Sequence, residues 1–465
     1  MNHPFSIKTS PDQHSELAIH PDSAAALGLG DKKFAHLCFG NRKQHVNIKL
    51  NRDISPAAVR LSQNLIGQLH LPEYPLYELR LNQNAVIIGP YIGLLVSTED
   101  HRLTSSRFTK MMVCLKEYAG LHGAVVMFAL NKVDRENRLI EGYCYHPVKK
   151  CWQKGIFPYP AAIYRTIGLN AAWKNHFLTE IGDKIFNSRF FNKWEMYQWF
   201  SKDPAISSHI PATVLYHSPQ DVFDMLAKYP EVYAKPTLGL RGRGIVRILT
   251  ENNLIQFKYR ESKENRDVSF TAAGQAGEYM QQRFRPGRYL IQQAVNLLEY
   301  QDGIIDFRCV VQKNQAGAWI CRAIIGRSGV KDSIVSNISS GGSAFPAELI
   351  LKKSGAKNSA ELKAAMTALA ITVCNQLDEY GINCGTLGLD IGIDRQGRLW
   401  LIEINNRDPD PSIALDIHDT SLYYDLKTGP LFYAKFLAGF KAMNDSQNDE
   451  SGGERLGAGR TPGTT

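Results

Sequence analysis

One segment near the C-terminal end, residues 387–405 (LGLDIGIDRQGRLWLIEIN), restricts the fold more than any other part of the chain. Its two apolar runs flank DRQG, a sequence typical of tight turns, and therefore predict an antiparallel hairpin. A two- or four-residue loop at that turn would pair Asp390 with Leu401. Because side chains two residues apart share one face of a strand, Asp390, Glu403 and Asn405 would then lie together.

That face offers two carboxylates and an amide oxygen, the hard oxygen donors that suit Mg²⁺. Without a cation the two carboxylates would repel each other, and one of them would have to stay protonated. Arg407 follows at the next two-residue step. The alternative is a half-solvated hairpin that carries ordinary surface acids, and the hairpin alone does not decide between the two.

A glycine-rich loop between two predicted strands forms a second constellation, in residues 233–248 (YAKPTLGLRGRGIVRI). Lys235 ends the first strand. The loop that follows carries Gly239, Arg241, Gly242, Arg243 and Gly244. Glycines let backbone N–H groups approach a phosphate chain closely, while lysine and arginine side chains add charge. No Gly-Lys-Ser/Thr opens a helix here, so this is not a Walker A loop. The alternative is a surface hairpin with exposed basic residues.

A third constellation consists of polar residues in and after later apolar strands. Its members are Arg308, Arg322, Arg327 and Asn337. An arginine in a buried strand needs an anionic partner, which a phosphate or an acidic substrate would supply. The alternative is structural pairing with Asp306 or Glu299.

The first hundred residues contain a faint internal repeat. LAIHPDSAAALGLG (residues 17–30) resembles VRLSQNLIGQLHLP (residues 59–72) at a constant offset of 42 residues. Each copy predicts a short helix with an apolar stripe, followed by strands that alternate in polarity. Two copies indicate a small, pseudo-symmetric β-rich unit over residues 1–100. Chance similarity is the alternative, because the match consists mostly of leucines.

Three further regions follow. Residues 101–185 combine a helix stopped by glycine with the apolar strand GAVVMFAL, which predicts a Rossmann-like α/β unit. Residues 186–440 alternate strands and helices and include a long amphipathic helix that ends at Gly381. Residues 441–465 contain almost no large apolar side chain and predict a disordered tail. The fold class is therefore α/β, in several domains.

Composition indicates the cellular environment and the classes of partner that the chain suits. The 465 residues carry 54 Lys+Arg and 45 Asp+Glu, a net charge of +9 that fits an anionic small ligand, an anionic surface or plain solubility. No basic block is interleaved with aromatic residues, which argues against nucleic-acid binding. The eight cysteines form no Cys-x-x-Cys pair, and no apolar run suits a secretory signal or a membrane span. We expect a reduced, cytoplasmic protein without nucleic-acid or membrane partners.

Taken in order, these motifs resemble the ATP-grasp superfamily. A strand lysine, a glycine-rich flap, an Asp-x-Arg strand and a final hairpin with Asp…Glu-x-Asn follow one another through residues 187–439. The whole layout, with the repeated N-terminal unit and the SNISSGGSA stretch, is similar to the YheC/YheD family, which is associated with the endospore coat. The resemblance implies a two-lobed α+β ATP-grasp domain preceded by the Rossmann-like and β-rich units.

The resemblance also implies roles for individual residues. The implied nucleotide contacts are Lys193, Lys235, Gly239, Arg241, Gly242, Gly244, Gln292, Gln293, Ala294 and Asn337. The implied Mg²⁺ ligands are Asp390, Glu403 and Asn405. The implied contacts to phosphate or acceptor are Arg308, Arg322 and Arg407. The backbone of Gln292, Gln293 and Ala294 would read adenine, and no carboxylate for the ribose hydroxyls is evident.

The implied function is that of an ATP- and Mg²⁺-dependent ligase that joins a carboxylate to an amine through an acylphosphate, with Arg322 or Arg407 steadying the developing charge. Two alternatives stay open: a non-catalytic nucleotide-binding factor of the spore coat, and kinase-like transfer to a hydroxyl. The expected partners are a nucleotide, an unidentified small-molecule or peptide acceptor, and spore-coat proteins. The sequence departs from many members at its Gln-Gln hinge and at NRDPDP after Asn405, which leaves the acceptor undefined.

Overall fold

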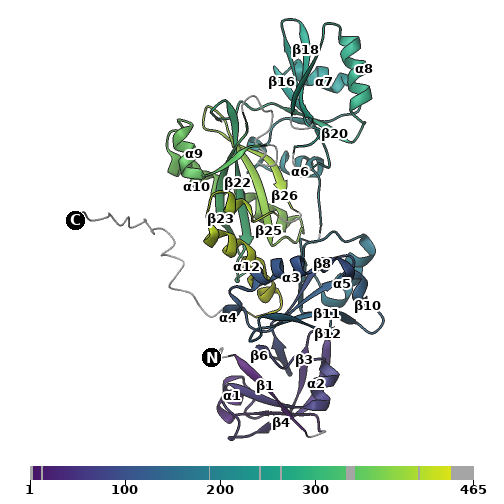
Figure 1. The fold of residues 1–465 in the computed structure, drawn as a ribbon, viewed down its shortest axis with the longest axis vertical. Helices are drawn as coiled ribbons and strands as arrows, with labels where there is room; N and C mark the ends of the chain where they lie inside the picture. The colour runs from purple at the N-terminus through teal and green to yellow at the C-terminus, as the bar shows by residue number, and fades with distance from the viewer. Residues whose placement is uncertain are drawn as a thin grey trace, which may run out of the picture.

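The computed structural model describes residues 4–11, 14–187, 189–239, 242–261, 264–330, 341–406 and 409–440. Within these residues, four sheets succeed one another along an elongated molecule (Figure 1). An N-terminal barrel lies at one end, an α/β sheet and a large lobe follow, and a small lobe lies at the other end.

The N-terminal unit is a closed barrel. Its strands are β1 (Phe5–Ser10), β2 (Glu16–Ile19), β3 (Phe34–Phe39), β4 (Arg42–Leu50), β5 (Ala58–Ser62), β6 (Leu76–Asn82) and β7 (Ala85–Gly89). Its helices are α1 (Pro21–Ala26) and α2 (Gln63–Leu69). The repeat is visible as two successive units, β2-α1-β3-β4 and β5-α2-β6-β7. The helix predicted at the start of each copy begins later than expected, because Leu17 and Leu61 lie in strands that fill the barrel core.

The second unit is a sheet in the order β10-β11-β9-β8-β13-β14, with β12 paired to β11. Its strands are β8 (Tyr91–Ser97), β9 (Ala124–Ala129), β10 (Val133–Asp134), β11 (Leu139–His146), β12 (Cys151–Pro158), β13 (Ala162–Arg165) and β14 (Ile185–Phe186). Its helices are α3 (Ser105–Met112), α4 (Tyr118–Leu121) and α5 (Ala171–Ile181). The apolar segment GAVVMFAL supplies β9, which pairs in parallel with β8 and is buried along its whole length, as its composition predicts.

The small lobe is a sheet in the order β15-β20-β16-β17-β18-β19, preceded by α6 (Lys193–Phe200). Its remaining elements are β15 (Thr213–Leu215), α7 (Pro219–Leu226), β16 (Glu231–Pro236), β17 (Val246–Glu251), β18 (Leu254–Glu261), β19 (Glu264–Phe270), α8 (Ala273–Arg283) and β20 (Tyr289–Gln293). Val232, Ile248 and Met280 pack together in the core beneath α7 and α8. Alternation along the strands therefore turns the opposite face, with Tyr233 and Arg247, toward the large lobe.

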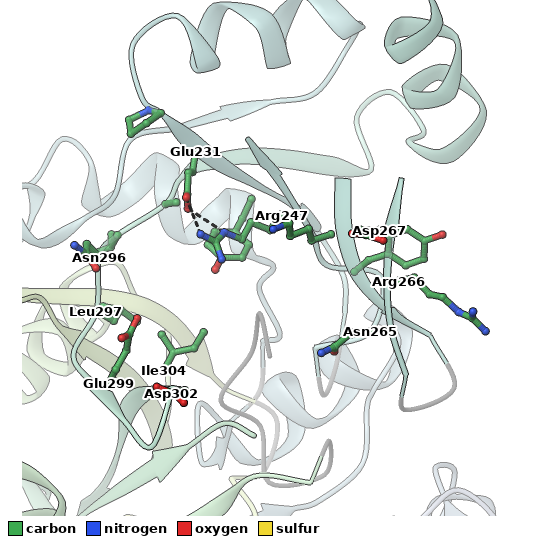
Figure 2. Close-up of a pocket in the computed structure, with 16 residues that line it drawn as sticks. Glu231, Arg247, Asn265, Arg266, Asp267, Asn296, Leu297, Glu299, Asp302 and Ile304 are labelled. Atoms are coloured by element: carbon green, nitrogen blue, oxygen red, sulfur yellow. Dashed lines mark hydrogen bonds and ion pairs between the residues drawn. The ribbon is translucent and has the colours of Figure 1, made fainter. Parts of the chain in front are cut away.

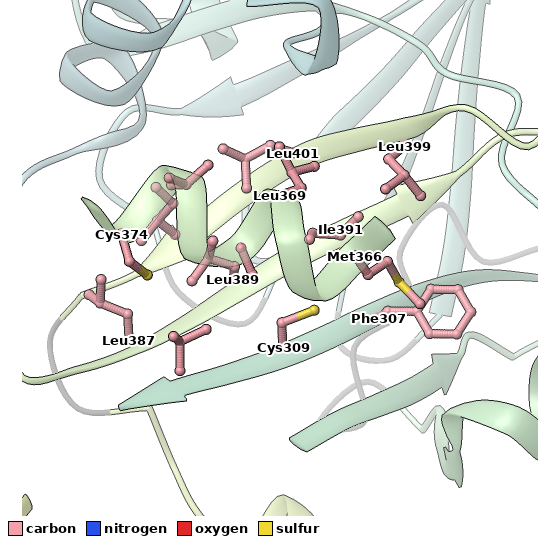
Figure 3. Packing of buried hydrophobic residues seen from close by; sticks show 14 of the residues in the cluster. Phe307, Cys309, Met366, Leu369, Cys374, Leu387, Leu389, Ile391, Leu399 and Leu401 are labelled. Carbon is pink, nitrogen blue, oxygen red and sulfur yellow. The ribbon is translucent and has the colours of Figure 1, made fainter. Parts of the chain in front are cut away.

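The large lobe is a sheet in the order β24-β23-β22-β25-β26. Its elements are β21 (Glu299–Tyr300), β22 (Gly303–Lys313), β23 (Trp319–Ser328), β24 (Ser343–Pro346), α9 (Ala347–Lys353), α10 (Ser359–Glu379), β25 (Thr386–Ile393), β26 (Leu399–Asn405), α11 (Ile413–Asp416) and α12 (Thr420–Leu437). Figure 3 shows α10 lying across the sheet, with Met366 and Leu369 against Phe307, Cys309 and Leu389. These apolar side chains fill one face, so the polar residues of the same strands lie on the other.

Helix α12 connects the large lobe to the two preceding units. Leu431 and Ala434 pack in the core of the α/β sheet. Lys435, which is buried, forms an ion pair with Glu78 on barrel strand β6 and donates to the carbonyl oxygen of Gly120 at 3.1 Å. No helix in the described ranges combines the length and apolar character needed to span a bilayer. The predicted disordered tail lies outside the described residues.

Candidate functional site

A cleft between the two lobes brings together residues from segments that are far apart in the sequence. Its inner part is a cavity of about 100 Å³. The charged and amide side chains that line it are Lys193, Lys235, Gln292, Gln293, Asp306, Arg327, Asp390 and Glu403. All of these except Asp306 and Arg327 belong to the residues given site roles above, so the structure brings six of those residues to one cavity.

The hairpin of β25 and β26 places Asp390 directly opposite Glu403. The predicted pairing of Asp390 with Leu401 is wrong, because the register shifts at this point. Ile391, the residue after Asp390, pairs with Leu401, which leaves Ile402 as the extra residue of a β-bulge.

The bulge decides which side chains of β26 reach the cleft. Leu401 and Ile404 both belong to the core beneath α10, although they are three residues apart. In a regular strand Glu403 would share the face of Leu401 and would point into that core. The extra residue reverses the alternation, so Glu403 and Asn405 lie on the cleft face with Asp390.

Two arginines hold Asp390. Arg308 donates from Nε to Oδ1 at 2.5 Å and from Nη2 to Oδ2 at 3.2 Å, and Nη2 of Arg327 lies 3.0 Å from Oδ2. Asn405 donates from Nδ2 to the same Oδ2 at 3.2 Å. Burial disfavours the charged form of Asp390, but the attraction of the two arginines outweighs it and lowers the pKa to about 2. Asp390 is therefore a carboxylate throughout the physiological range.

Arg327 has a second carboxylate, Asp306, which the sequence-based site did not include. Its Nε and Nη2 donate to the two oxygens of Asp306 at 2.7 and 2.5 Å, and both side chains are buried. Structural pairing with Asp306, the alternative considered for the arginines, thus holds for Arg327 and not for Arg308. The Asp-x-Arg pattern of residues 306–308 was a usable signal for Asp306, since both polar groups face the cleft from one strand.

Lys193 is the first residue of α6, where a capping box between Asn192 and Glu195 begins the helix. Its Nζ lies 2.9 Å from Oε1 of Glu403 and donates to the carbonyl oxygen of Gly239 at 3.3 Å. One ammonium group therefore contacts both the glycine-rich flap and a predicted metal ligand.

Lys235 lies on β16 and donates to Oε1 of Gln292 at 2.5 Å. Burial lowers the pKa of Lys235 to about 8; Lys193 acts in the same direction, while Glu403 and Asp306 oppose the shift. An anion that approached Lys235 would favour its charged form. The lysine is thus suited to respond to a phosphate.

The predicted adenine-reading segment lies between the lobes, but its backbone is already engaged. The N–H of Gln293 donates to the carbonyl oxygen of Ala212 at 2.8 Å, and the N–H of Ala294 donates to that of Glu231 at 3.1 Å. Val295, which was not predicted, lines the inner cavity and the larger one beside it. Its position directly after the hinge is the signal that would have identified it.

The remaining predicted residues fall into two groups. Arg241, Asn337 and Arg407 lie outside the described residues. Arg322 is exposed on β23 with Asp425 of α12 as a charged neighbour, and it is not among the residues that line either cavity. In the flap, Gly244 has φ +75° and a Cβ there would lie 3.0 Å from Pro236, so this turn requires glycine.

A larger cavity of about 680 Å³ adjoins the inner one and shares Tyr233, Val295, Leu297 and Ile304 with it. Figure 2 shows Glu231 and Arg247 together on the small-lobe side, joined by hydrogen bonds of 2.9 and 2.6 Å. Glu299 and Asp302 lie on the opposite side, after the hinge. These carboxylates are candidates for contacts to sugar hydroxyls, which the sequence did not identify.

The oxygen donors fit a Mg²⁺ ion in type and number. Asp390, Glu403 and Asn405 provide two carboxylates and an amide on one face. Within the described ranges, no further Asp, Glu, His or Cys joins the two carboxylates to form a metal-binding group of three. The rest of the coordination would therefore come from water or phosphate oxygens, which is usual for Mg²⁺.

Comparison with known proteins identifies the family of the chain. A family model described as YheC/D like ATP-grasp matches residues 182–437, more than half of the chain. The endospore coat-associated protein YheD of Bacillus subtilis (strain 168) is 29% identical over 421 residues, which cover 87% of this chain and 90% of that protein. The endospore coat-associated protein YheC of the same strain is 24% identical over 216 residues, which cover 46% of this chain and 59% of that protein.

Solved structures give weaker matches. The VanG D-Ala:D-Ser ligase from Enterococcus faecalis is 9% identical with a TM-score of 0.41, over 75% of this chain and 100% of that chain. The N5-carboxyaminoimidazole ribonucleotide synthetase from Thermotoga maritima is 11% identical with a TM-score of 0.40, over 73% and 76% of the two chains. The chain and these enzymes share little sequence, and the family of the chain is shown by the match over residues 182–437.

Proposed function

Because the chain belongs to the YheC/D-like ATP-grasp family, we propose that it is an ATP- and Mg²⁺-dependent ligase that joins a carboxylate to an amine through an acylphosphate. The observation that carries the proposal is the set of charges in one cleft. Its cations are Lys193, Lys235, Arg308 and Arg327. They surround Asp390 and Glu403, two carboxylates on one face of the sheet, a combination that suits a triphosphate with its metal ion.

In this proposal the phosphates of ATP lie between Lys193 and Lys235 in the inner cavity, and the base lies beside the hinge where the larger cavity adjoins it. The sugar extends into the larger cavity toward Glu299 and Asp302, which can accept hydrogen bonds from hydroxyls. Asp390, Glu403 and Asn405 would hold Mg²⁺. The ion would supply neutralisation of the charge on the terminal phosphates.

The chemistry would proceed in two transfers. A carboxylate oxygen of the first substrate attacks the γ-phosphorus of ATP, and ADP leaves with the bonding electrons. An amine then attacks the acyl carbon, inorganic phosphate leaves, and the nitrogen loses a proton to solvent. Arg308 and Arg327, which contact Asp390 in the cleft, suit the stabilisation of the transferring phosphoryl group better than the exposed Arg322. Closure of the flap would exclude water.

The names of the two relatives associate them with the endospore coat, and we propose the same association for this chain. A second candidate function is nucleotide binding without turnover, as a structural factor of the coat. The ion pairing of Asp390 and Glu403 favours it, because a metal ion would first have to displace Lys193, Arg308 and Arg327 from these carboxylates.

Incubation with ATP, Mg²⁺ and a panel of amino acids tests the proposal. Release of ADP and phosphate that depends on an acceptor supports the ligase. ADP with a stable phosphorylated product would show a kinase instead, and tight nucleotide binding without ADP would show the structural role. A thermal shift with ATP and Mg²⁺ comes first, and its absence would contradict nucleotide binding altogether.

A further inference from the structure

We propose that the cleft accepts its divalent cation only together with nucleotide phosphates, and that Lys193, Arg308 and Arg327 impose this specificity. The inference rests on the proposed function, because it concerns the same site. We call these three cations, with the carboxylates Asp390 and Glu403 that they hold, the charge lock.

Both carboxylates of the charge lock are already engaged. Asp390 receives Arg308 on both oxygens, at 2.5 and 3.2 Å, and Arg327 at 3.0 Å. Glu403 receives Lys193 at 2.9 Å. Hydrogen bonds between ionised partners are the stronger class, so a metal ion must displace strong contacts to reach either ligand.

Asn405, the third predicted ligand, directs its amide nitrogen and not its oxygen toward Asp390. Asn405 directs Nδ2 to Oδ2 of Asp390 at 3.2 Å. A carboxylate only accepts hydrogen bonds, so the nitrogen of the amide must face it and the oxygen must face elsewhere. Asn405 has to rotate before its oxygen can coordinate, which requires that Asp390 first release it.

Electrostatic repulsion explains why a metal ion alone does not displace the three cations of the charge lock. A bare divalent cation would enter a space that an ammonium and two guanidinium groups already occupy, and like charges repel at this range. A triphosphate brings several negative charges that accept hydrogen bonds from Lys193, Arg308 and Arg327. When these side chains turn to the phosphates, Asp390 and Glu403 become available to the metal. Phosphate and metal should therefore bind with positive coupling.

Surrounding residues keep the cations in place. Arg327 is anchored to Asp306 through two hydrogen bonds of 2.7 and 2.5 Å, so it stays in the cleft when Asp390 leaves it. Arg308 reaches Asp390 across Gly388, where a Cβ would lie 3.1 Å from the Cδ of the arginine. Asp306 thus anchors Arg327, and Gly388 leaves space for the side chain of Arg308.

The test measures metal binding rather than activity, with Mn²⁺ as the probe and electron paramagnetic resonance to count free ions. The wild-type protein is titrated alone and with the non-hydrolysable ATP analogue AMP-PNP. The analogue itself binds Mn²⁺ through its phosphates, so a protein-free titration with AMP-PNP is measured and subtracted. Beyond that binding, we expect Mn²⁺ to bind the cleft between about 5- and 150-fold more tightly with the analogue, the usual range for coupled sites. Binding that persists in the Glu403→Gln variant does not depend on Glu403 and is subtracted.

Two variants open the lock from different sides. Arg308→Gln frees Oδ1 of Asp390, while Arg327 stays on Oδ2, and Lys193→Met frees Glu403, so each should raise the affinity for Mn²⁺ alone by at least about fivefold. Lys363→Met is the matched control, because it removes a lysine from an exposed ion pair with Glu348 on the large lobe. The control should bind Mn²⁺ like the wild type. Circular dichroism shows which variants fold, and either one suffices.

The inference is overturned if Mn²⁺ binds the wild-type cleft equally well with and without AMP-PNP, or if a folded lock variant leaves the affinity for Mn²⁺ alone unchanged. A different result would contradict the proposed nucleotide-dependent function. In that case AMP-PNP produces no thermal shift with metal present, while the metal-only titrations of the variants still decide the charge lock.

Discussion

The substitution Glu403→Gln separates the chemistry of the cleft from its folding. Glutamine keeps the size of the side chain and can still accept a hydrogen bond from Lys193. Lys193 also retains its contact with the carbonyl oxygen of Gly239, so its ammonium is not left unpaired. The strand itself is held by Leu401 and Ile404 in the core on its other face. Only the negative charge is lost.

The expected magnitudes follow from this setting. The Glu403 side chain is 29% exposed and that of Lys193 is 13% exposed. Since the pair is partly solvated and a hydrogen bond survives, we expect the free energy of unfolding to fall by about 1 kcal/mol or less. Turnover should fall by at least about 100-fold, about 2.7 kcal/mol of barrier, because even the outer partners of metal ligands cost about 10- to 100-fold.

A coupled assay of ADP release across a range of Mg²⁺ concentrations measures the loss, and urea unfolding measures the stability. Glu348→Gln is the control, since it makes the same change in an exposed pair with Lys363, where side chains are 61% and 46% exposed. It should leave turnover unchanged. Turnover by Glu403→Gln within threefold of wild type would refute the metal assignment; a large loss of stability would refute the claim that the core holds this strand.

Three further outcomes are expected. Nucleotide affinity should fall as pH rises through about 8, the pKa of Lys235, since the lysine is charged below that pH and neutral above it. Calorimetric titrations of nucleotide between about pH 7 and 9.5 measure this change in affinity. Gly388→Ala should weaken nucleotide binding by roughly tenfold in the same assay, by pushing Arg308 off the cleft. Lys435→Met should cost about 3–5 kcal/mol in urea unfolding, because it removes the ammonium group that pairs with the buried Glu78 and leaves only His122, 3.5 Å away, beside that carboxylate; adding Glu78→Gln should recover part of the loss.

The positions of several site residues could be predicted because each interrupts or ends an apolar strand. Lys235 follows VYA, Asp390 lies within LGLDIGI, and Glu403 follows LWLI. A charged group at such a place has to face a cleft or a partner, and the structure places all three around the inner cavity. The β-bulge was not predictable, because Leu401 and Ile402 are both apolar and alternation cannot reveal which of them is the extra residue.

The ion pairs could not be predicted, because they depend on which strands become neighbours. β22 lies between β23 and β25, so Arg308 faces Asp390, which is 82 residues away, rather than Asp306 on its own strand. The residues of the small lobe that line the larger cavity were not predicted, for a related reason. β18 and β19 were not predicted, and they carry Lys258 and Asp267 of its lining.

Lys193 couples release of the glycine-rich flap to release of the predicted metal ligand Glu403. Its ammonium group contacts the flap at Gly239 and the metal ligand Glu403 at the same time. A phosphate that binds Lys193 therefore releases a flap contact and a ligand carboxylate together. Release of the flap from Lys193 and entry of the metal should then be one coupled step, and a substitution in the flap should change metal affinity although the flap contributes no carboxylate.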